Sequence, residues 1–138
     1  MVQKECIFCQ IISGGIPCHR VYEDDAVLAF LDIGPISIGH TLVVPKEHYE
    51  KLHNCSVEVL SVISAATGKI AGVVAEEMRA DGYNVLCNNG RSAGQLVDHV
   101  HFHEIPRKID DGLFQRWPKF EYSSGQAEKI AARIREKL

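Results

Sequence analysis

The stretch His99-Val100-His101-Phe102-His103 governs how the rest of the chain is interpreted, because three histidines alternate in it with two apolar residues. Successive side chains of a β-strand point to opposite faces, so positions 99, 101 and 103 share one face. Val100 and Phe102 then point to the other face, toward a core. A single histidine would be interpreted as an ordinary half-buried or solvated residue. Three imidazoles on one strand face crowd, repel one another when protonated and lose packing area, which indicates metal or phosphate chemistry.

The composition predicts a single globular domain spanning residues 1–138. The chain has 138 residues, of which 46% are hydrophobic and 24% charged, enough to bury a core. Its formal net charge of -3 argues against a general nucleic-acid binder, although one local site could still bind a small anion. We see no charged-then-apolar leader and no long apolar run, so we expect no signal peptide, no membrane span and a cytoplasmic protein.

The periodicity of the sequence predicts an α+β fold, with an antiparallel sheet of about five strands, one long helix and short terminal helices. Ser56 is a good N-cap for the long helix, which we expect to reach about Arg79, with Gly82 as its C-cap. Pro106 should end the histidine strand. The βαβ alternation, the G-x-G-x-x-G motif and the P-loop are missing from the sequence. The other expected elements are a short helix within 6–13, strands at 20–23, 26–31, 40–44 and 83–87, and a basic helix at 126–138.

Cysteine usage points to a metal site rather than to disulfides. Five cysteines are an odd number, and only Cys6 and Cys9 have the C-x-x-C spacing of half a tetrahedral zinc site. The same spacing occurs in redox motifs, but no thioredoxin-like βαβ pattern surrounds it here. The other two zinc ligands would have to be distant histidines, and a reducing compartment is the simpler setting.

The segment from Gly94 to Pro106 is similar to the signature of the histidine triad family, whose members are nucleotidyl hydrolases and transferases that pass through a nucleotidyl-histidine. The resemblance runs from Cys6 to about Arg107, and the family fold is an α+β unit of the kind expected here. Two positions depart from the family pattern: Glu104 replaces an apolar residue, and Leu96 stands where several members carry Ser or Thr. Further matching pieces are Ile7-Phe8, Tyr22-Glu23-Asp24, Phe30-Leu31-Asp32, the run from Gly39 to Lys46, and Asn88-Asn89-Gly90.

The resemblance implies roles for particular residues. His101 would be the nucleophile that attacks the α-phosphorus of a purine nucleotide, with its second ring nitrogen held by a backbone carbonyl, and His103 would touch phosphate oxygens. Asn88 and Gln95 would supply amide contacts to phosphate, although Asn88-Asn89-Gly90 also reads as an ordinary turn. Asp32 would bind the ribose hydroxyls or simply cap its turn. The residues that would sandwich the base, each equally explicable as core, are Phe8, Ile11, Ile16, Phe30 and Leu42.

The resemblance also completes the zinc site and suggests a partner. Some relatives pair the C-x-x-C with a later histidine and with the first histidine of the triad, which implies a structural zinc at Cys6, Cys9, His48 and His99. His40 matches a family histidine near the site, without a role that the sequence explains. A two-fold homodimer is expected, because the long helix is apolar over more than one stripe and strand 83–87 could extend a neighbour's sheet.

The function expected from these features is hydrolysis of adenosine phosphoramidates through a nucleotidyl-histidine on His101. Alternatives are a dinucleoside polyphosphate hydrolase, a zinc-stabilised nucleotide-binding module without turnover, and a metallohydrolase whose three histidines hold a catalytic metal. Leu96 bears on the choice of leaving group, because a departing amine must gain a proton and leucine has none to give. His103 or a water could supply that proton instead.

Overall fold

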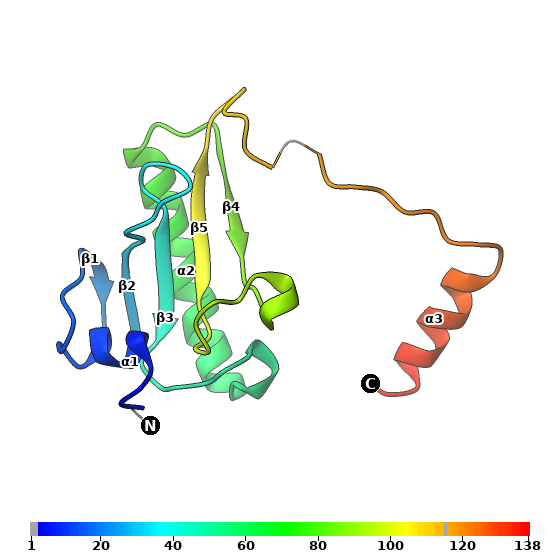
Figure 1. Ribbon diagram of the computed structural model, residues 1–138, viewed down its shortest axis with the longest axis horizontal. Helices are drawn as coiled ribbons and strands as arrows, with labels where there is room; N and C mark the ends of the chain where they lie inside the picture. The colour runs from blue at the N-terminus through cyan, green and yellow to red at the C-terminus, as the bar shows by residue number, and fades with distance from the viewer. Residues whose placement is uncertain (1–2, 115) are drawn as a thin grey trace.

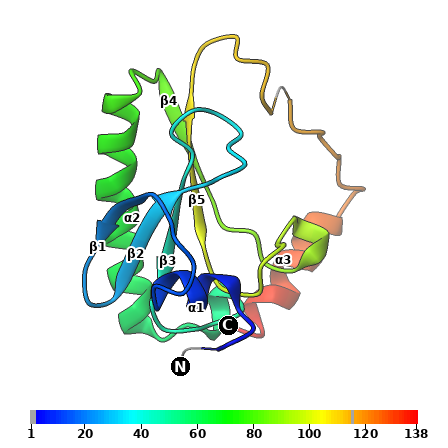
Figure 2. The same cartoon turned by 60° about the vertical axis from the view of Figure 1, so that its left-hand side comes forward.

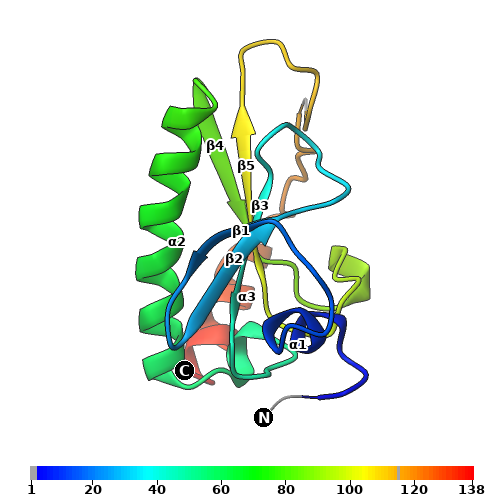
Figure 3. The same cartoon turned by 90° about the vertical axis from the view of Figure 1, so that its left-hand side faces the viewer.

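The fold is a five-stranded antiparallel sheet with a helix on each face, which confirms the expected α+β class. The computed structural model describes residues 3–114 and 116–138, and the strand order is β1-β2-β3-β5-β4 (Figure 1). Viewed along the sheet edge, α2 lies on one side and α1 on the other (Figure 3). The elements are α1 (Ile7–Ile12), β1 (Arg20–Glu23), β2 (Val27–Leu31), β3 (Thr41–Pro45), α2 (Val57–Glu77), β4 (Gly82–Leu86), β5 (Phe102–Arg107) and α3 (Gln126–Arg135), with short 3₁₀ turns at Leu52–Asn54 and Arg91–Ala93.

The long helix α2 begins where the sequence predicts and ends slightly earlier than expected. Ser56 is its N-cap, with Oγ accepting a hydrogen bond from the Val59 N–H at 3.2 Å. The helix closes at Met78, and Arg79 takes the left-handed conformation with φ of 49°. Gly82 is therefore not the C-cap but the first residue of β4, so the expectation for Gly82 is wrong.

Each face of the sheet carries its own apolar core. Beneath α2 the sheet contributes Val27, Ala29 and Val43, and the helix contributes Ile63, Ala66 and Ile70. On the opposite face Leu28, Phe30, Leu42 and Val44 pack around Phe8 of α1. Alternate residues of one strand therefore serve different cores, as strand geometry requires. Helix α1 lies at the end of the sheet where β5 begins (Figure 2).

The histidine stretch leads into β5 rather than forming it. The strand starts at Phe102, so His99 and His101 precede it, and it continues through Pro106 to Arg107. Pro106 therefore does not end the strand as expected. Its carbonyl accepts a hydrogen bond from the Ser37 hydroxyl at 2.7 Å, on the side away from β4. Since the N and C=O of a strand residue point to the same side, the missing N–H of Pro106 removes no hydrogen bond to β4.

Two regions leave apolar surface uncovered in a single chain. Helix α2 is long and apolar enough to span a membrane by length and composition, and only 28% of its most apolar stretch is buried. It nevertheless packs along β2 to β5, as the core helix of a globular protein does. After β5 the chain runs out as an extended arm that carries α3 away from the sheet (Figure 1). The exposed aromatic residues of this arm are Phe114, Trp117, Phe120 and Tyr122.

Candidate active site

His101 has the geometry of a nucleophile held in one tautomer. Its ring is buried, and Nδ1–H donates to the His99 carbonyl oxygen at 2.6 Å. The proton of the neutral ring therefore lies on Nδ1, and Nε2 carries the lone pair. Burial is the main cause that lowers the pKa of His101 below its ordinary value. The ring is thus neutral near pH 7, which is the state that nucleophilic attack requires.

His103 lies beside His101 on the same face of the sheet. The two ring centroids are 4.9 Å apart, and on its other side His103 Nδ1 lies 2.9 Å from Nε2 of the buried His40. Burial, with smaller effects from the neighbouring imidazoles His101 and His40, lowers the pKa of His103 to about 4. All three rings are therefore neutral at physiological pH, so they do not repel one another.

Cys6, Cys9, His48 and His99 come together from three parts of the chain, and their ligand atoms all lie within 4.8 Å of one another. Nδ1 of His99 is 3.5 Å from Cys6 Sγ, 3.7 Å from Cys9 Sγ and 3.2 Å from His48 Nδ1, and Cys9 Sγ is 3.4 Å from His48 Nδ1. A tetrahedral zinc at ordinary bond lengths separates its sulfur and nitrogen ligands by about 3.5 Å and two nitrogens by about 3.3 Å. The four side chains therefore fit a zinc ion in both chemistry and spacing.

The ring of His99 is oriented for such a role by the backbone of β3. Its Nε2–H donates to the Pro45 carbonyl at 2.8 Å, which leaves the Nδ1 lone pair facing the two cysteines. Metal-bound histidines commonly use their second nitrogen in this way. Burial lowers the pKa of His99 to about 4, so the ring is neutral and able to bind a metal without first losing a proton.

Phe8 links the cysteines to the triad. Its ring packs edge-on against His101 with centroids 5.0 Å apart, and also against His99 and Phe30. Phe30 and Leu42 are buried with Phe8 in one core cluster, and Ile11 packs against it. Ile16 is half-buried in the loop after α1. These expected base-binding residues are thus largely core, and Phe8 is the one that the ring contacts place against His101.

Asp32 and Asn88 lie in loops at the ends of strands. Oδ1 of Asp32 accepts the Gly34 N–H at 2.8 Å, which caps the turn, and Oδ2 lies 3.7 Å from His40 Nε2. One carboxylate oxygen is thus used locally and the other faces the histidines. Asn88 is half-buried, and its amide lies against Gly94, where a Cβ would be 3.4 Å from Asn88 Nδ2. Gly94 has φ of 90°, which favours glycine and keeps the backbone open at this point.

The side-chain amide of Gln95 is hydrogen-bonded to backbone groups of the protein. Its side chain is buried, Oε1 accepts the Gly90 N–H at 2.7 Å, and Nε2 donates to the carbonyls of Glu50 and Val97. In this conformation Gln95 braces the loop before the triad. The expected phosphate contact would require it to give up one of these three bonds.

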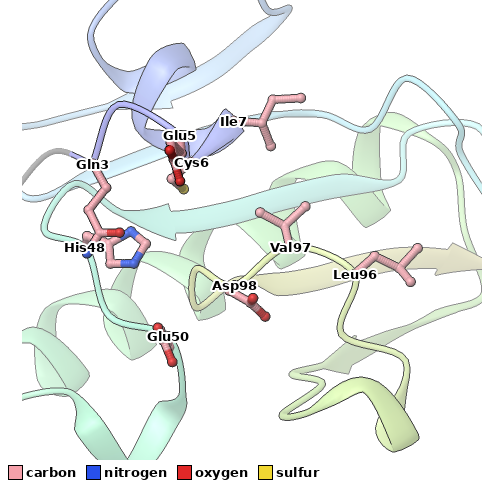
Figure 4. Close-up of a pocket in the computed structure, with 9 residues that line it drawn as sticks. All are labelled: Gln3, Glu5, Cys6, Ile7, His48, Glu50, Leu96, Val97 and Asp98. Carbon is pink, nitrogen blue, oxygen red and sulfur yellow. The ribbon is translucent and has the colours of Figure 1, made fainter.

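A polar hollow lies beside the cysteine–histidine cluster. Cys6 and His48 line it together with Leu96 and Val97, and its rim carries three carboxylates (Figure 4). Those acids are Glu5, Glu50 and Asp98, all of them exposed. His101 is not among the residues that line this hollow. Leu96, one of the residues that line the hollow, is 80% exposed.

Comparison with known proteins identifies the family. The model of the HIT domain matches residues 13–110 of this chain. The chain belongs to the HIT family. This membership confirms the resemblance on which the site residues were predicted. The adenosine 5'-monophosphoramidase hnt1 of Schizosaccharomyces pombe is 44% identical over 134 residues, which cover 96% of this chain and 98% of that protein.

Two solved structures extend the comparison to the fold of the HIT proteins. A HIT family protein from Bacillus subtilis is 42% identical, covers 98% of both chains and has a TM-score of 0.92. A Zn-bound histidine triad family protein from Mycobacterium smegmatis is 38% identical, covers 97% of this chain and 98% of that chain, and has a TM-score of 0.76. These likenesses confirm the fold class over nearly the whole HIT chain.

Sequence reasoning missed the partners that hold the histidines of this HIT protein. The carbonyl of Pro45 and the ring of His40 both contact triad histidines, yet neither is adjacent to them in the sequence. For His40 the family resemblance had already placed the residue near the site, and its position directly before the strand that pairs with β5 agrees with this, but the sequence did not show what it contacts.

Proposed function

We propose that the protein is a nucleotidyl hydrolase that acts on purine nucleoside phosphoramidates, with His101 as its nucleophile. The observation that carries this proposal is the neutral, buried imidazole of His101, whose Nδ1–H is fixed by a backbone carbonyl. The family membership and the printed activity of the Schizosaccharomyces pombe relative support the substrate class. The chain covers nearly the full length of that relative.

In the proposed reaction Nε2 of His101 attacks the α-phosphorus while the P–N bond to the amine breaks and the amine leaves with the bonding electron pair. The attacking ring becomes positively charged, and the Nδ1–H donated to the His99 carbonyl stabilises that charge. Water then attacks the nucleotidyl-histidine and the P–N bond to His101 breaks, which releases the nucleoside monophosphate and restores neutral His101, while the proton that the water loses passes to solvent. Asp32 would hold the ribose, Asn88 the phosphate and Phe8 one side of the base, while Gln95 braces the loop before the triad.

The leaving group decides between two reactions of this family. An amine must be protonated as it departs, whereas a polyphosphate leaves readily as an anion. The exposed Leu96 has no proton to donate, so we propose that a water molecule supplies it. We expect adenosine phosphoramidate to give a higher kcat/KM than diadenosine polyphosphates, and Leu96→Ser to raise the former selectively. Equal or better turnover of the dinucleotide would assign the protein to the other reaction.

The His101→Asn variant tests the function itself. We expect loss of at least about a thousandfold in kcat with nucleotide binding retained, because the nucleophile is removed while the surrounding contacts remain. Undiminished turnover by His101→Asn would contradict the role of His101. A wild-type protein that binds nucleotide without any turnover would instead support the binding-module alternative.

We propose a structural zinc at Cys6, Cys9, His48 and His99. All four positions of a tetrahedral ion are taken by protein ligands, so the ion would tie α1 to the triad rather than take part in catalysis. A metallohydrolase would instead need an open metal position at the triad, and its turnover would stop with a chelator. We expect about one zinc per chain in protein prepared without chelator. Less than one zinc per several chains, or a Cys6–Cys9 disulfide in reduced protein, would contradict this site.

We also propose a two-fold homodimer. The surface of α2 that does not face the sheet exposes Val62 and Val73, and the edge strand β4 exposes Tyr83 and Val85. The most apolar stretch of α2 is largely unburied in one chain, and the projecting arm adds exposed aromatic residues. A second copy of the chain is the simplest way to bury both of these apolar surfaces. Light scattering at micromolar concentration should give twice the chain mass, whereas a monomeric mass would refute the dimer. The cytoplasmic location, and the absence of membrane and nucleic-acid partners, stay predictions.

A further inference from the structure

The tautomer of His103 is set by hydrogen bonds that begin at the backbone of the loop before β3. The N–H of Ile36 can only donate, and it lies 3.1 Å from Nδ1 of His40. His40 must therefore accept at Nδ1 and carry the proton of its neutral ring on Nε2. The ring is 2% exposed, and burial lowers its pKa, so the neutral form is the one present.

The same reasoning passes from His40 to His103. Their ring nitrogens, Nε2 of His40 and Nδ1 of His103, are 2.9 Å apart, which is the length of a hydrogen bond. Because Nε2 of His40 carries the proton, it donates, and Nδ1 of His103 accepts. The proton of neutral His103 is then on Nε2, the nitrogen opposite to its bond with His40.

We propose that His40 is a positioning residue that holds His103 in the tautomer whose Nε2–H donates to an oxygen of the substrate's α-phosphate. This inference rests on the proposed nucleotidyl transfer at His101. His101 presents an Nε2 lone pair to the phosphorus, so its neighbour must present a hydrogen. If His103 instead carried its proton on Nδ1, the Nε2 lone pairs of both His101 and His103 would face the negatively charged phosphate. His103 stays neutral throughout the reaction and transfers no proton.

A metal ion is the competing interpretation of this cluster, because Asp32, His40 and His103 each offer a ligand atom within 4.8 Å of the others. The 2.9 Å between the two ring nitrogens is shorter than the roughly 3.3 Å that two nitrogens on a tetrahedral ion require. The Ile36 N–H also shows that His40 is a neutral ring with one proton, and that proton lies between the two histidines. The geometry favours a hydrogen bond.

Two substitutions at His40 separate its two contacts. In His40→Gln the amide N–H₂ takes the place of Nε2–H and can still donate to His103, whereas the acceptor for Ile36 is lost. In His40→Asn the amide oxygen can still accept from Ile36, whereas the donor to His103 is lost. Ser37→Ala is the matched control for the loop, since it removes the 2.7 Å bond to Pro106 and leaves the His40 ring contacts intact.

Nitrogen-15 NMR of the histidine rings in the full chain reads the tautomers directly, with His103 assigned from the signals absent in His103→Gln. We expect unprotonated Nδ1 and protonated Nε2 at His103 in the wild type, His40→Gln and Ser37→Ala, and a mixture of tautomers in His40→Asn. With adenosine phosphoramidate, kcat should fall about 10- to 1000-fold in His40→Asn with a smaller change in KM, stay within about tenfold in His40→Gln, and remain unchanged in Ser37→Ala.

Three results would overturn the role of His40. One is a protonated Nδ1 at His103 in the wild type. Another is an equal loss in His40→Gln and His40→Asn, or a loss in Ser37→Ala as large as in His40→Asn, either of which assigns His40 to loop structure alone. The third is a second bound metal that His40→Asn removes and Cys9→Ser does not. If the wild type shows no turnover, the proposed function fails, and the NMR signals still decide the tautomer.

Discussion

His103 and Glu104 are neighbours on β5, yet the two faces of the sheet to which they point treat buried polar groups in opposite ways. On the site face, Pro45, His99 and Ile36 supply backbone groups that hold His99, His101 and His40 in defined tautomers. On the α2 face, within the part of the chain that the structure describes, both carboxyl oxygens of Glu104 and the Thr67 hydroxyl are buried without a hydrogen-bond partner.

The paired polar groups on the site face give it a defined arrangement, whereas the unpaired polar groups on the α2 face lower the stability of the fold. Fully paired buried polar groups fix a single arrangement, which a catalytic site needs. An unpaired buried carboxyl destabilises the folded chain, because it has left water without gaining a partner. Burial raises the pKa of Glu104 to about 8, so the carboxyl stays protonated in the folded protein at neutral pH. This unfavourable free energy of burial arises on the face of the sheet that lies away from the triad.

The largest expected effect comes from removing one ligand, Cys9, from the cysteine–histidine cluster. We expect Cys9→Ser to lose the proposed zinc and to lower the free energy of unfolding by several kcal/mol, on the order of 3 to 5, because the remaining ligands His48 and His99 then no longer share a metal ion. Metal analysis and thermal unfolding measure the two effects. Cys55→Ser, which lies outside the cluster, should keep both zinc and stability. A Cys9→Ser protein with unchanged metal content would sink the zinc assignment.

Replacing the unpaired Glu104 on the α2 face should stabilise the protein, with an effect of intermediate size. An unfolded Glu104 ionises near its ordinary pKa of 4.5, and the folded one near 8, so between these values the unfolded state binds fewer protons. The buried histidines, whose pKa values are lowered, contribute a slope of the opposite sign below about pH 6.5. The Glu104 contribution to the free energy of unfolding should fall as the pH rises from about 4.5 to 8 and then level off. Glu104→Val should remove this slope and stabilise the protein by a few kcal/mol at pH 8.

The Glu104→Gln variant sharpens that measurement. It keeps an unpaired polar group but cannot ionise, so it should lose the Glu104 contribution to the pH slope while remaining less stable than Glu104→Val by about 1–3 kcal/mol. Denaturant unfolding at several pH values measures both quantities. A stability difference between Glu104→Val and the wild type that does not widen as the pH rises through this window would contradict an unpaired, buried Glu104.

The smallest expected effect is at Thr67. Its hydroxyl is buried on α2 without a hydrogen-bond partner in residues 3–114 and 116–138, and valine has nearly the same shape without the polar atom. Thr67→Val should therefore raise the free energy of unfolding by about 1 kcal/mol, measured by denaturant unfolding at constant pH. Thr41→Val is the contrasting control, because the Thr41 hydroxyl donates to the Gly39 carbonyl at 2.8 Å and its removal should destabilise.

Local sequence patterns predicted the parts of the molecule that depend on local geometry. Ser56 marks the start of α2 because a hydroxyl before an apolar helix caps it, and the alternation of His101, Phe102 and His103 places the histidines on the site face. The C-x-x-C spacing located half of a metal cluster, and the family resemblance supplied His48 and His99.

Features that depend on how distant segments meet could not be predicted in this way. The link between His40 and His103 joins residues 63 positions apart, and it requires the Ile36 loop to fold back onto the ring. Gln95 looked available for phosphate, but Gly90 and Glu50 use its amide. Glu104 was visible as a departure from the family, yet the sequence could not show that none of the described residues pairs with it.

Trapping the covalent intermediate tests the central claim most directly. Protein mixed with adenosine phosphoramidate is quenched within the first turnovers, digested and examined by mass spectrometry, with His101→Asn and His103→Gln treated in parallel. The account predicts one adenylyl group on the peptide from 99 to 103, located at His101, absent from His101→Asn and reduced but still at His101 in His103→Gln. Turnover without any adenylylated protein, or adenylylation at another residue, would contradict it.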